Sequence, residues 1–227
     1  MKKILWAEMT MEEIESVDKE YTVVLFPVGS VEGHGPHLPV KCDSHNVTEL
    51  CKRVALEAGK QEINVMVVPT LMFGYSEWMA YPGKLSLDAD TFMTVVRKVC
   101  ESIIDNDFKK IIIVNGHGGN PSCLYVAAQQ LYNKHKIIIP VMDWFKVVAD
   151  SVGDIIQTTM WHADEGETSV SLALDMNVEM SKAGKETPRS PLKSFDQTNL
   201  GLSQVQYCIP FTTITERSVT GIMGDAT

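Results

Sequence analysis

The sequence lacks an excess of basic residues, a long apolar run and any C-x-x-C pair. Its 20 lysines and arginines stand against 29 aspartates and glutamates, and a net charge of −9 repels phosphate backbones, which argues against nucleic-acid binding. No stretch approaches the roughly 18 consecutive apolar residues of a membrane span. The five cysteines are odd in number and lack metal-binding spacing, which is typical of reduced thiols. A cytoplasmic protein without nucleic-acid or membrane partners is therefore expected.

Apolar residues, by contrast, are plentiful, at 44% of the 227 residues, and they support one domain, residues 1–227, with a sizeable core. Short β-branched runs predict buried strands at 22–28, 64–71, 110–115 and 136–142. Amphipathic stretches predict helices at 44–59, 88–107 and 121–135. This alternation predicts an α/β fold with a mostly parallel sheet and helices on both faces. The polar stretch 182–201 predicts a surface excursion.

Three polar clusters follow predicted strands or lead into a helix, where the crevice of an open α/β sheet is expected. The first cluster follows the strand at 22–28 and contains Glu32, His34, His37, Asp43 and His45. The second is "NGHGGNP" at 115–121, with His117 between glycines. The third is "WHADEGETS" at 161–169, with His162, Asp164, Glu165 and Glu167, and it leads into an apolar helix over 169–176.

Imidazole and carboxylate side chains together favour ions of the zinc, manganese or iron type over calcium or magnesium. Two such ions could share a carboxylate such as Asp43, and they would acidify a water near neutral pH. The separate residues also have simpler interpretations. Asp43 alone would be a helix N-cap, and a single histidine in such a loop more often forms hydrogen bonds than binds a metal. "NGHGGN" could hold a phosphate, although it lacks the lysine of a P-loop, and Asp164 and Glu165 could be solvated.

Five segments together resemble the creatininase (creatinine amidohydrolase) family, in order and over nearly the whole chain. They are "PVGSVEGHGPHLPVKCD", "GYSEWMAYPGKLSL", "IIIVNGHGGN", "HADEGETSVSLAL" and "GIMGDAT". The resemblance implies a three-layer α/β/α fold, a homo-oligomer (often a hexamer), a small-molecule substrate and a hydrolytic site with two divalent metal ions, Zn, Mn or Fe.

The same resemblance implies roles for individual residues. Glu32 and His117 match ligands of one metal, His34 a ligand of the other, and Asp43 the bridge. His162 matches the proton-transfer residue. Glu167 is expected to be catalytic and to complete the second metal site, because creatininase proper has a glutamate at the position of Gly119. The expected substrate contacts are Ser76, Trp78, Gly118 and Trp144.

Several positions depart from creatininase proper, which has a tyrosine at the position of Gly118. Many members have histidine at the position of Trp78, and most have threonine at that of Lys84. Creatinine is therefore not the expected substrate. We expect a dinuclear metal-dependent amidohydrolase that cleaves a C–N bond of a small cyclic amide or formamide. The alternatives are a ring-opening hydrolase of a cyclic polyol ketone of the inosose type, and a non-catalytic metal-binding scaffold.

Overall fold

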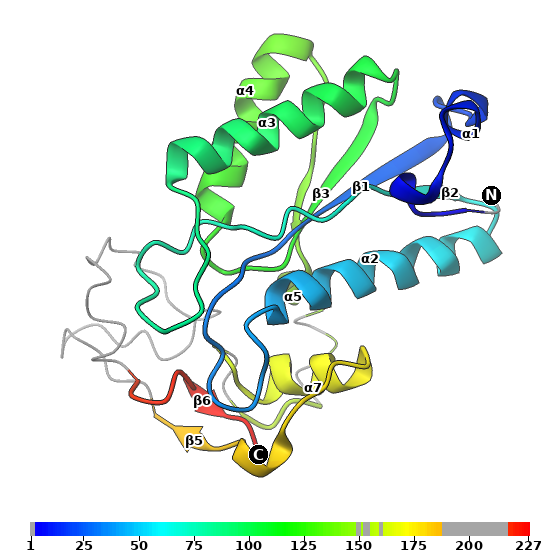
Figure 1. Ribbon diagram of the computed structural model, residues 1–227. Helices are drawn as coiled ribbons and strands as arrows, with labels where there is room; N and C mark the ends of the chain where they lie inside the picture. Colours follow the sequence, from blue (N-terminus) through cyan, green and yellow to red (C-terminus); the bar gives the residue numbers. More distant parts are fainter. Residues whose placement is uncertain (1–2, 149–150, 152–154, 159–160, 188–217) are drawn as a thin grey trace.

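A four-stranded parallel sheet forms the centre of the fold (Figure 1). The computed structural model describes residues 3–148, 151, 155–158, 161–187 and 218–227. The strand order in the sheet is β2 (Asn64–Val67), β1 (Thr22–Val28), β3 (Lys110–Asn115) and β4 (Val141–Asp143). All three pairs of neighbouring strands are parallel, so their carboxyl ends meet at one edge.

Helices cover both faces of this sheet, as Figure 1 shows, and the alternation of side chains along β1 defines the layers. Val24 and Phe26 pack in one apolar cluster with residues of α3 (Ala89–Asp105) and α4 (Pro121–His135). Leu25 points to the opposite face and packs in a second cluster with residues of α2 (Cys42–Lys60). The α/β fold with three layers and a mostly parallel sheet is therefore confirmed.

The predicted boundaries are best where turn or capping residues border the pattern. The bounds predicted for β1, β3 and α4 are those observed. Helix α2 begins two residues before its predicted start, and α3 lies within its predicted range, with Asp88 as its N-cap.

The prediction of a strand at 136–142 was wrong for most of its length, because only residues 141–143 pair with β3. Lys136 adopts a left-handed conformation that ends α4, and Ile138 is 76% exposed. The chain thus reaches the sheet only at its carboxyl edge, where β4 aligns with the last three residues of β3. The strand predicted at 64–71 is likewise shorter and ends at Val67.

The C-terminal segments pack beside the loop that follows β1. Helix α7 (Glu165–Ala173) starts before the predicted 169–176, because Asp164 is its N-cap and accepts a hydrogen bond from the Glu167 amide. Asp164 is therefore buried rather than solvated. The remaining short elements are η1 (Trp6–Glu8), α1 (Met11–Ser16), α5 (Trp144–Val147), η2 (Met180–Lys182), β5 (Lys185–Glu186) and β6 (Gly224–Asp225).

Of the surface excursion predicted at 182–201, residues 188–201 lie outside the described residues. Among the helices that the structure describes, each is too short or too polar to cross a membrane.

Candidate metal centre

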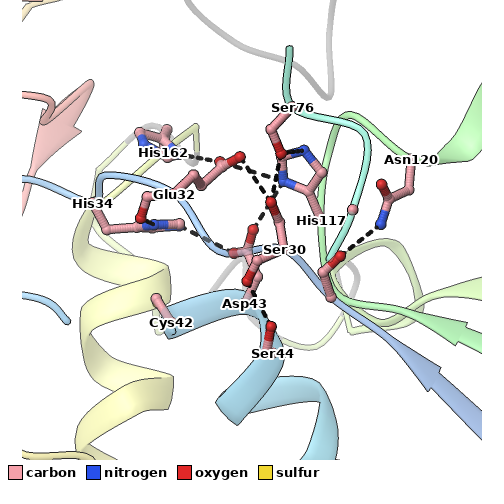
Figure 2. Close-up of polar contacts among 12 residues, drawn as sticks. Ser30, Glu32, His34, Cys42, Asp43, Ser44, Ser76, His117, Asn120 and His162 are labelled. Carbon is pink, nitrogen blue, oxygen red and sulfur yellow. Dashed lines mark hydrogen bonds and ion pairs between the residues drawn. The ribbon is translucent and has the colours of Figure 1, made fainter. Parts of the chain in front are cut away.

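Buried imidazoles and carboxylates from all three predicted clusters meet at the carboxyl edge of the sheet (Figure 2). Glu32 and His34 lie in the loop after β1, and Asp43 is in the first turn of α2. His117 follows β3, and His162 precedes α7. Each of these residues is at most 7% exposed, so the cluster is enclosed by protein. The structure therefore brings together part of each predicted cluster.

Asp43 lies between two histidines and contacts both. Its Oδ1 is 3.0 Å from Nε2 of His34, and its Oδ2 is 2.8 Å from Nδ1 of His117. Its interpretation as a helix N-cap is wrong, because Lys41 occupies the cap position of α2 and Asp43 is the second helical residue. The carboxylate is instead placed to join two imidazoles.

Hydrogen bonds to backbone carbonyls fix which ring nitrogen of each histidine carries a hydrogen. Nδ1 of His34 donates to the Glu32 carbonyl at 3.1 Å, and Nε2 of His117 donates to the Tyr75 carbonyl at 3.3 Å. Nε2 of His162 donates to the Gly33 carbonyl at 2.9 Å. The other nitrogen of each ring faces the carboxylates, so in a neutral ring its lone pair points toward those of the oxygens.

Such an arrangement needs a cation, because facing lone pairs repel and the atoms are shielded from water. Within the described residues, Glu32 Oε1, His34 Nε2 and Asp43 Oδ2 are buried without a hydrogen-bond partner. The nitrogens of His34 and His117 are therefore close to the Asp43 oxygens, but the angles between these groups are not those of hydrogen bonds. Ligand atoms of Glu32, Asp43 and His117 lie within 4.8 Å of one another, and so do those of Glu32, His34 and His162. The residues thus fit a metal ion.

The electrostatics of the cluster lead to the same conclusion. Burial disfavours a charged imidazole, but Asp43 and the nearby glutamates outweigh it and raise the pKa of His34 to about 10. Burial is likewise outweighed at His117, where Glu32 and Asp43 raise the pKa to about 9. Burial would raise the pKa of Asp43, but the two imidazoles hold it below its usual range. The buried carboxylates are therefore stabilised by positive charge nearby, which protons on the imidazoles or a metal ion can supply.

His162 differs from the other two histidines because it stays neutral. Burial and the neighbouring His34 lower its pKa to about 3, and the two rings lie 4.3 Å apart between centroids. Its Nδ1 is 3.9 Å from Glu32 Oε1. Because its Nε2 hydrogen is held by Gly33, this Nδ1 is a free acceptor at the edge of the cluster.

Glu167, in the first turn of α7, lies beside the cluster. It does not belong to the sets of residues whose ligand atoms lie within 4.8 Å of one another. Its Oε2 is 3.7 Å from His34 Nε2 and accepts a hydrogen bond from the Ala163 amide at 2.5 Å. Burial, together with the charges of Asp43 and Asp164, raises its pKa to about 8 despite the opposing effect of His34. The structure therefore places this carboxyl next to the half of the centre that contains His34.

The residues expected to contact substrate lie around His117, with Trp144 placed further along the sheet edge. Ser76 Oγ is 2.5 Å from Ser30 Oγ and 3.3 Å from His117 Nε2, and the Trp78 ring stacks on that of His117. A side chain at Gly119 would meet the Trp78 ring, whereas one at Gly118 would meet no atom within 4 Å among those described. Trp144 is buried at the start of α5, directly after β4.

Two histidines of the first cluster act as structural residues. His37 Nε2 forms a 2.9 Å hydrogen bond with Thr168 Oγ1, and His45 Nε2 donates to the Leu174 carbonyl. Both bonds join the segment around the start of α2 to α7 and its end. For these two residues, the hydrogen-bonding interpretation was the correct one.

The sequence analysis overlooked several polar residues that hold the cluster in place or lie beside it. Ser30 Oγ donates to Glu32 Oε2, and Asn115 contacts the backbone of His117 at both its amide and its carbonyl. Asn120 donates to the Gly29 carbonyl and so fastens the "NGHGGN" loop to the loop after β1. Cys42 adjoins His34 and Asp43, with ligand atoms within 4.8 Å of one another. Adjacency to the motif residues was the available signal for all four.

Comparisons with known proteins show the family of this chain. A sequence profile of the creatininase family, described as creatinine amidohydrolase, matches residues 7–227. A 3-dehydro-scyllo-inosose hydrolase of Thermotoga maritima is 30% identical, over 75% of this chain and 56% of that protein. A creatinine amidohydrolase of Pseudomonas putida is 29% identical, over 76% of this chain and 72% of that protein.

A crystal structure of creatininase has the same fold, with a TM-score of 0.76 and 22% sequence identity, covering 100% of this chain and 89% of that one. Solved creatininase structures include forms named for zinc and for manganese. Fold and site together define an α/β protein with a buried cluster of imidazoles and carboxylates that fits metal ions. The chain belongs to the creatininase family.

Proposed function

We propose that this protein is a dinuclear metal-dependent amidohydrolase that cleaves a C–N bond of a small cyclic amide or formamide. The observation that carries the proposal is the set of buried ring nitrogens that face buried carboxylate oxygens around Asp43. One ion would be held by Glu32, His117 and Asp43. The other would be held by His34, Asp43 and Glu167, with Asp43 shared between them. Zinc, manganese and iron all suit these donors.

Bound divalent ions would acidify the attacking water and polarise the substrate carbonyl. The protein residues supply the rest of the reaction. His162 is neutral, with Nδ1 free, so it can accept the proton of the attacking water. It then gives that proton to the nitrogen that leaves when the C–N bond breaks. Glu167, whose pKa is raised in the metal-free protein, can hold a proton beside His34 there and would give up that proton on binding the second ion.

The residues around His117 support a substrate other than creatinine. Trp78 occupies the space that a side chain at position 119 would need, so a glutamate like that of creatininase proper has no room here. Gly118 leaves open space where that enzyme has a tyrosine. We propose that Ser76, Trp78, Gly118 and Trp144 surround a substrate of a different shape.

A substrate panel tests the C–N assignment directly. The metal-loaded protein would be assayed with lactams, cyclic ureides, formamides and inososes, with release of amine or formate and ring opening as readouts. Turnover of a lactam or formamide is the expected result. If the inososes alone turned over, the C–N assignment would be wrong and the alternative below would replace it.

The alternative is a metal-dependent hydrolase that opens the ring of a cyclic polyol ketone. The inosose hydrolase of Thermotoga maritima, 30% identical over 75% of this chain, is the observation that favours it. Both reactions place a carbonyl carbon next to the same ions, so the centre itself does not distinguish the two reactions. The substrate panel distinguishes them, because it contains substrates of both classes.

A non-catalytic metal-binding scaffold is the competing class. Substitution of His162 distinguishes a scaffold from an enzyme. Its ring is close to the centre, but we propose that it carries a proton and does not bind a metal. We expect His162→Ala to keep its metals and to lose about 10²–10⁴-fold in rate. A scaffold would bind ligand equally well with and without the imidazole and would show no turnover in either form.

We further propose that residues 1–227 act as one domain in a cytoplasmic homo-oligomer, with a hexamer favoured by the family resemblance. The four described cysteines, Cys42, Cys51, Cys100 and Cys123, are all free, which supports a reducing compartment. Light scattering on the purified protein would measure the mass of the assembly, and a stable monomer would contradict the oligomer.

A further inference from the structure

Cys42 lies beside the half of the centre that contains His34, although the metal roles above leave it unused (Figure 2). It is the first residue of α2 and directly precedes Asp43. Its side chain is fully buried, and the ligand atoms of His34, Cys42 and Asp43 lie within 4.8 Å of one another. His34 Nε2, also buried, has no hydrogen-bond partner among the described residues. A sulfur and an available imidazole nitrogen therefore face the same small space.

Polar groups surround the Cys42 sulfur on its other side. Asn46 Nδ2 donates to Sγ at 3.5 Å, and Ser171 Oγ lies 3.4 Å from Sγ. Asn46 Nδ2 also donates to Ser171 Oγ at 2.9 Å, so the two groups are fixed in place. The Asn46 donor orients the sulfur, while burial and the carboxylates of Glu167 and Asp43 raise the pKa of the Cys42 thiol, so a thiolate here needs a bound cation.

The contrast with Cys51 shows that this environment is particular to Cys42. Cys51 lies in the same helix and is equally buried, but it packs in an apolar cluster with Val47 and Ala55. Cys42 also touches an apolar cluster, through Leu38 and Met176. Packing alone is therefore the competing explanation, and Cys51 is the natural control for it.

We propose that Cys42 Sγ is a ligand of the second metal ion, together with His34 Nε2 and Asp43. This rests on the two-ion centre proposed above and changes its chemistry. On binding, the thiol loses its proton to solvent and binds as a thiolate. Thiolate ligands favour zinc over manganese, whereas carboxylates suit manganese. The two sites would therefore differ, with the Cys42 site selective for zinc.

Cobalt substitution tests this without relying on activity. The full-length protein would be stripped of metal and titrated with Co²⁺ while its near-ultraviolet absorption is recorded. A thiolate ligand produces a sulfur-to-cobalt charge-transfer band, so wild type should show the band as the second equivalent binds. Cys42→Ser should lose the band and lose at least roughly tenfold in its preference for zinc over manganese.

Matched variants assign the band to one cysteine. Cys51→Ser and Cys208→Ser, which change other thiols, should both keep it. Wild-type protein that binds two ions without the band would overturn the role of Cys42 and leave the two-metal proposal intact. Wild-type protein that binds no ion at all would overturn both.

The outcome does not depend on Cys42→Ser folding well. If that variant does not fold, X-ray absorption of zinc-loaded Cys51→Ser/Cys208→Ser decides, because a Zn–S shell at about 2.3 Å is expected there and its absence would refute the proposal.

Discussion

Asp43 can be distinguished from an ordinary helix residue by removing its charge while keeping its shape. Its two oxygens face His34 and His117. In the two-ion centre proposed above, Asp43→Asn would leave both ions without a shared ligand and without the charge that screens their repulsion. We expect Asp43→Asn to lose both ions, whereas Glu32→Gln should empty one site and leave the other partly filled. Elemental analysis of the purified variants measures this.

Asp88→Asn is the matched control for that experiment. Asp88 is a genuine N-cap, because its side chain accepts a hydrogen bond from the Thr91 amide at the start of α3. Asparagine caps about as well as aspartate, so Asp88→Asn should keep its metals and its stability. Retention of both ions and full activity in Asp43→Asn would defeat the bridging role.

Gly119 and Trp78 form a pair in which one residue excludes a side chain at the other. A Cβ at Gly119 would approach the Trp78 ring to 2.3 Å, so Gly119→Glu must displace the indole that stacks on His117. We expect Gly119→Glu to cost about 1–3 kcal/mol of stability, as overpacking does. Adding Trp78→His should restore part of that loss, because a Cβ at Gly119 would also approach His117 Nε2 to 2.5 Å. Urea denaturation of the single and double variants measures the coupling, and equal losses in the two would contradict it.

At the scale of elements, α7 is held against the loop after β1 by side-chain hydrogen bonds. Thr168→Val removes the hydroxyl that pairs with His37 Nε2 and leaves a buried ring without its partner. We expect a loss of about 1–3 kcal/mol in the free energy of unfolding, measured by urea denaturation. Because α7 also carries Glu167, substrate turnover should fall as well.

The exposed Thr91 provides the comparison for Thr168. Its hydroxyl donates to the Asp88 carboxylate at the surface, so Thr91→Val should change stability by less than about 0.5 kcal/mol. Equal effects of the two substitutions would mean that the bond between His37 and Thr168 does not hold α7.

The elements that the sequence predicted well are those whose pattern is local. Helix α4 begins at Pro121, just after Asn120, and ends in basic residues, so its bounds could be read directly. Strand β4 could not, because the run at 136–142 is as apolar as the buried strands, and only pairing with β3 selects residues 141–143. The start of α7 was missed because its N-cap, Asp164, stands within a polar motif.

The site shows the same division between local and tertiary information. The motif residues could be named from the sequence, since strand ends in a parallel sheet meet at one edge. The partners of each residue could not. The bonds of His37 and His45 to α7 join positions more than 100 residues apart, and no spacing in the sequence encodes them.

At the scale of the whole molecule, the centre couples stability to metal and pH. The sheet edge gathers buried carboxylates from separate segments, and the folded chain must compensate their charge. In the metal-free protein, protonated His34 and His117 do so, with pKa values of about 10 and 9 against an ordinary value of 6.5. Metal and protons therefore compete, and metal affinity should rise with pH.

This competition gives a pH profile whose sign can be worked out. Because the folded-state pKa of each ring is raised, its stabilising contribution is complete below about pH 6.5 and is lost as the pH rises through about 9 to 10. The Tm of the metal-free protein should therefore fall by several degrees over that window. The zinc-loaded protein should change much less, because the ion replaces the protons. Thermal melts in chelator and in zinc, from about pH 6 to 10, measure both. Asp43→Asn is the control, since without the carboxylate the metal-free profile should flatten, and a metal-free wild type whose Tm stays constant or rises would show that these imidazoles do not carry the charge.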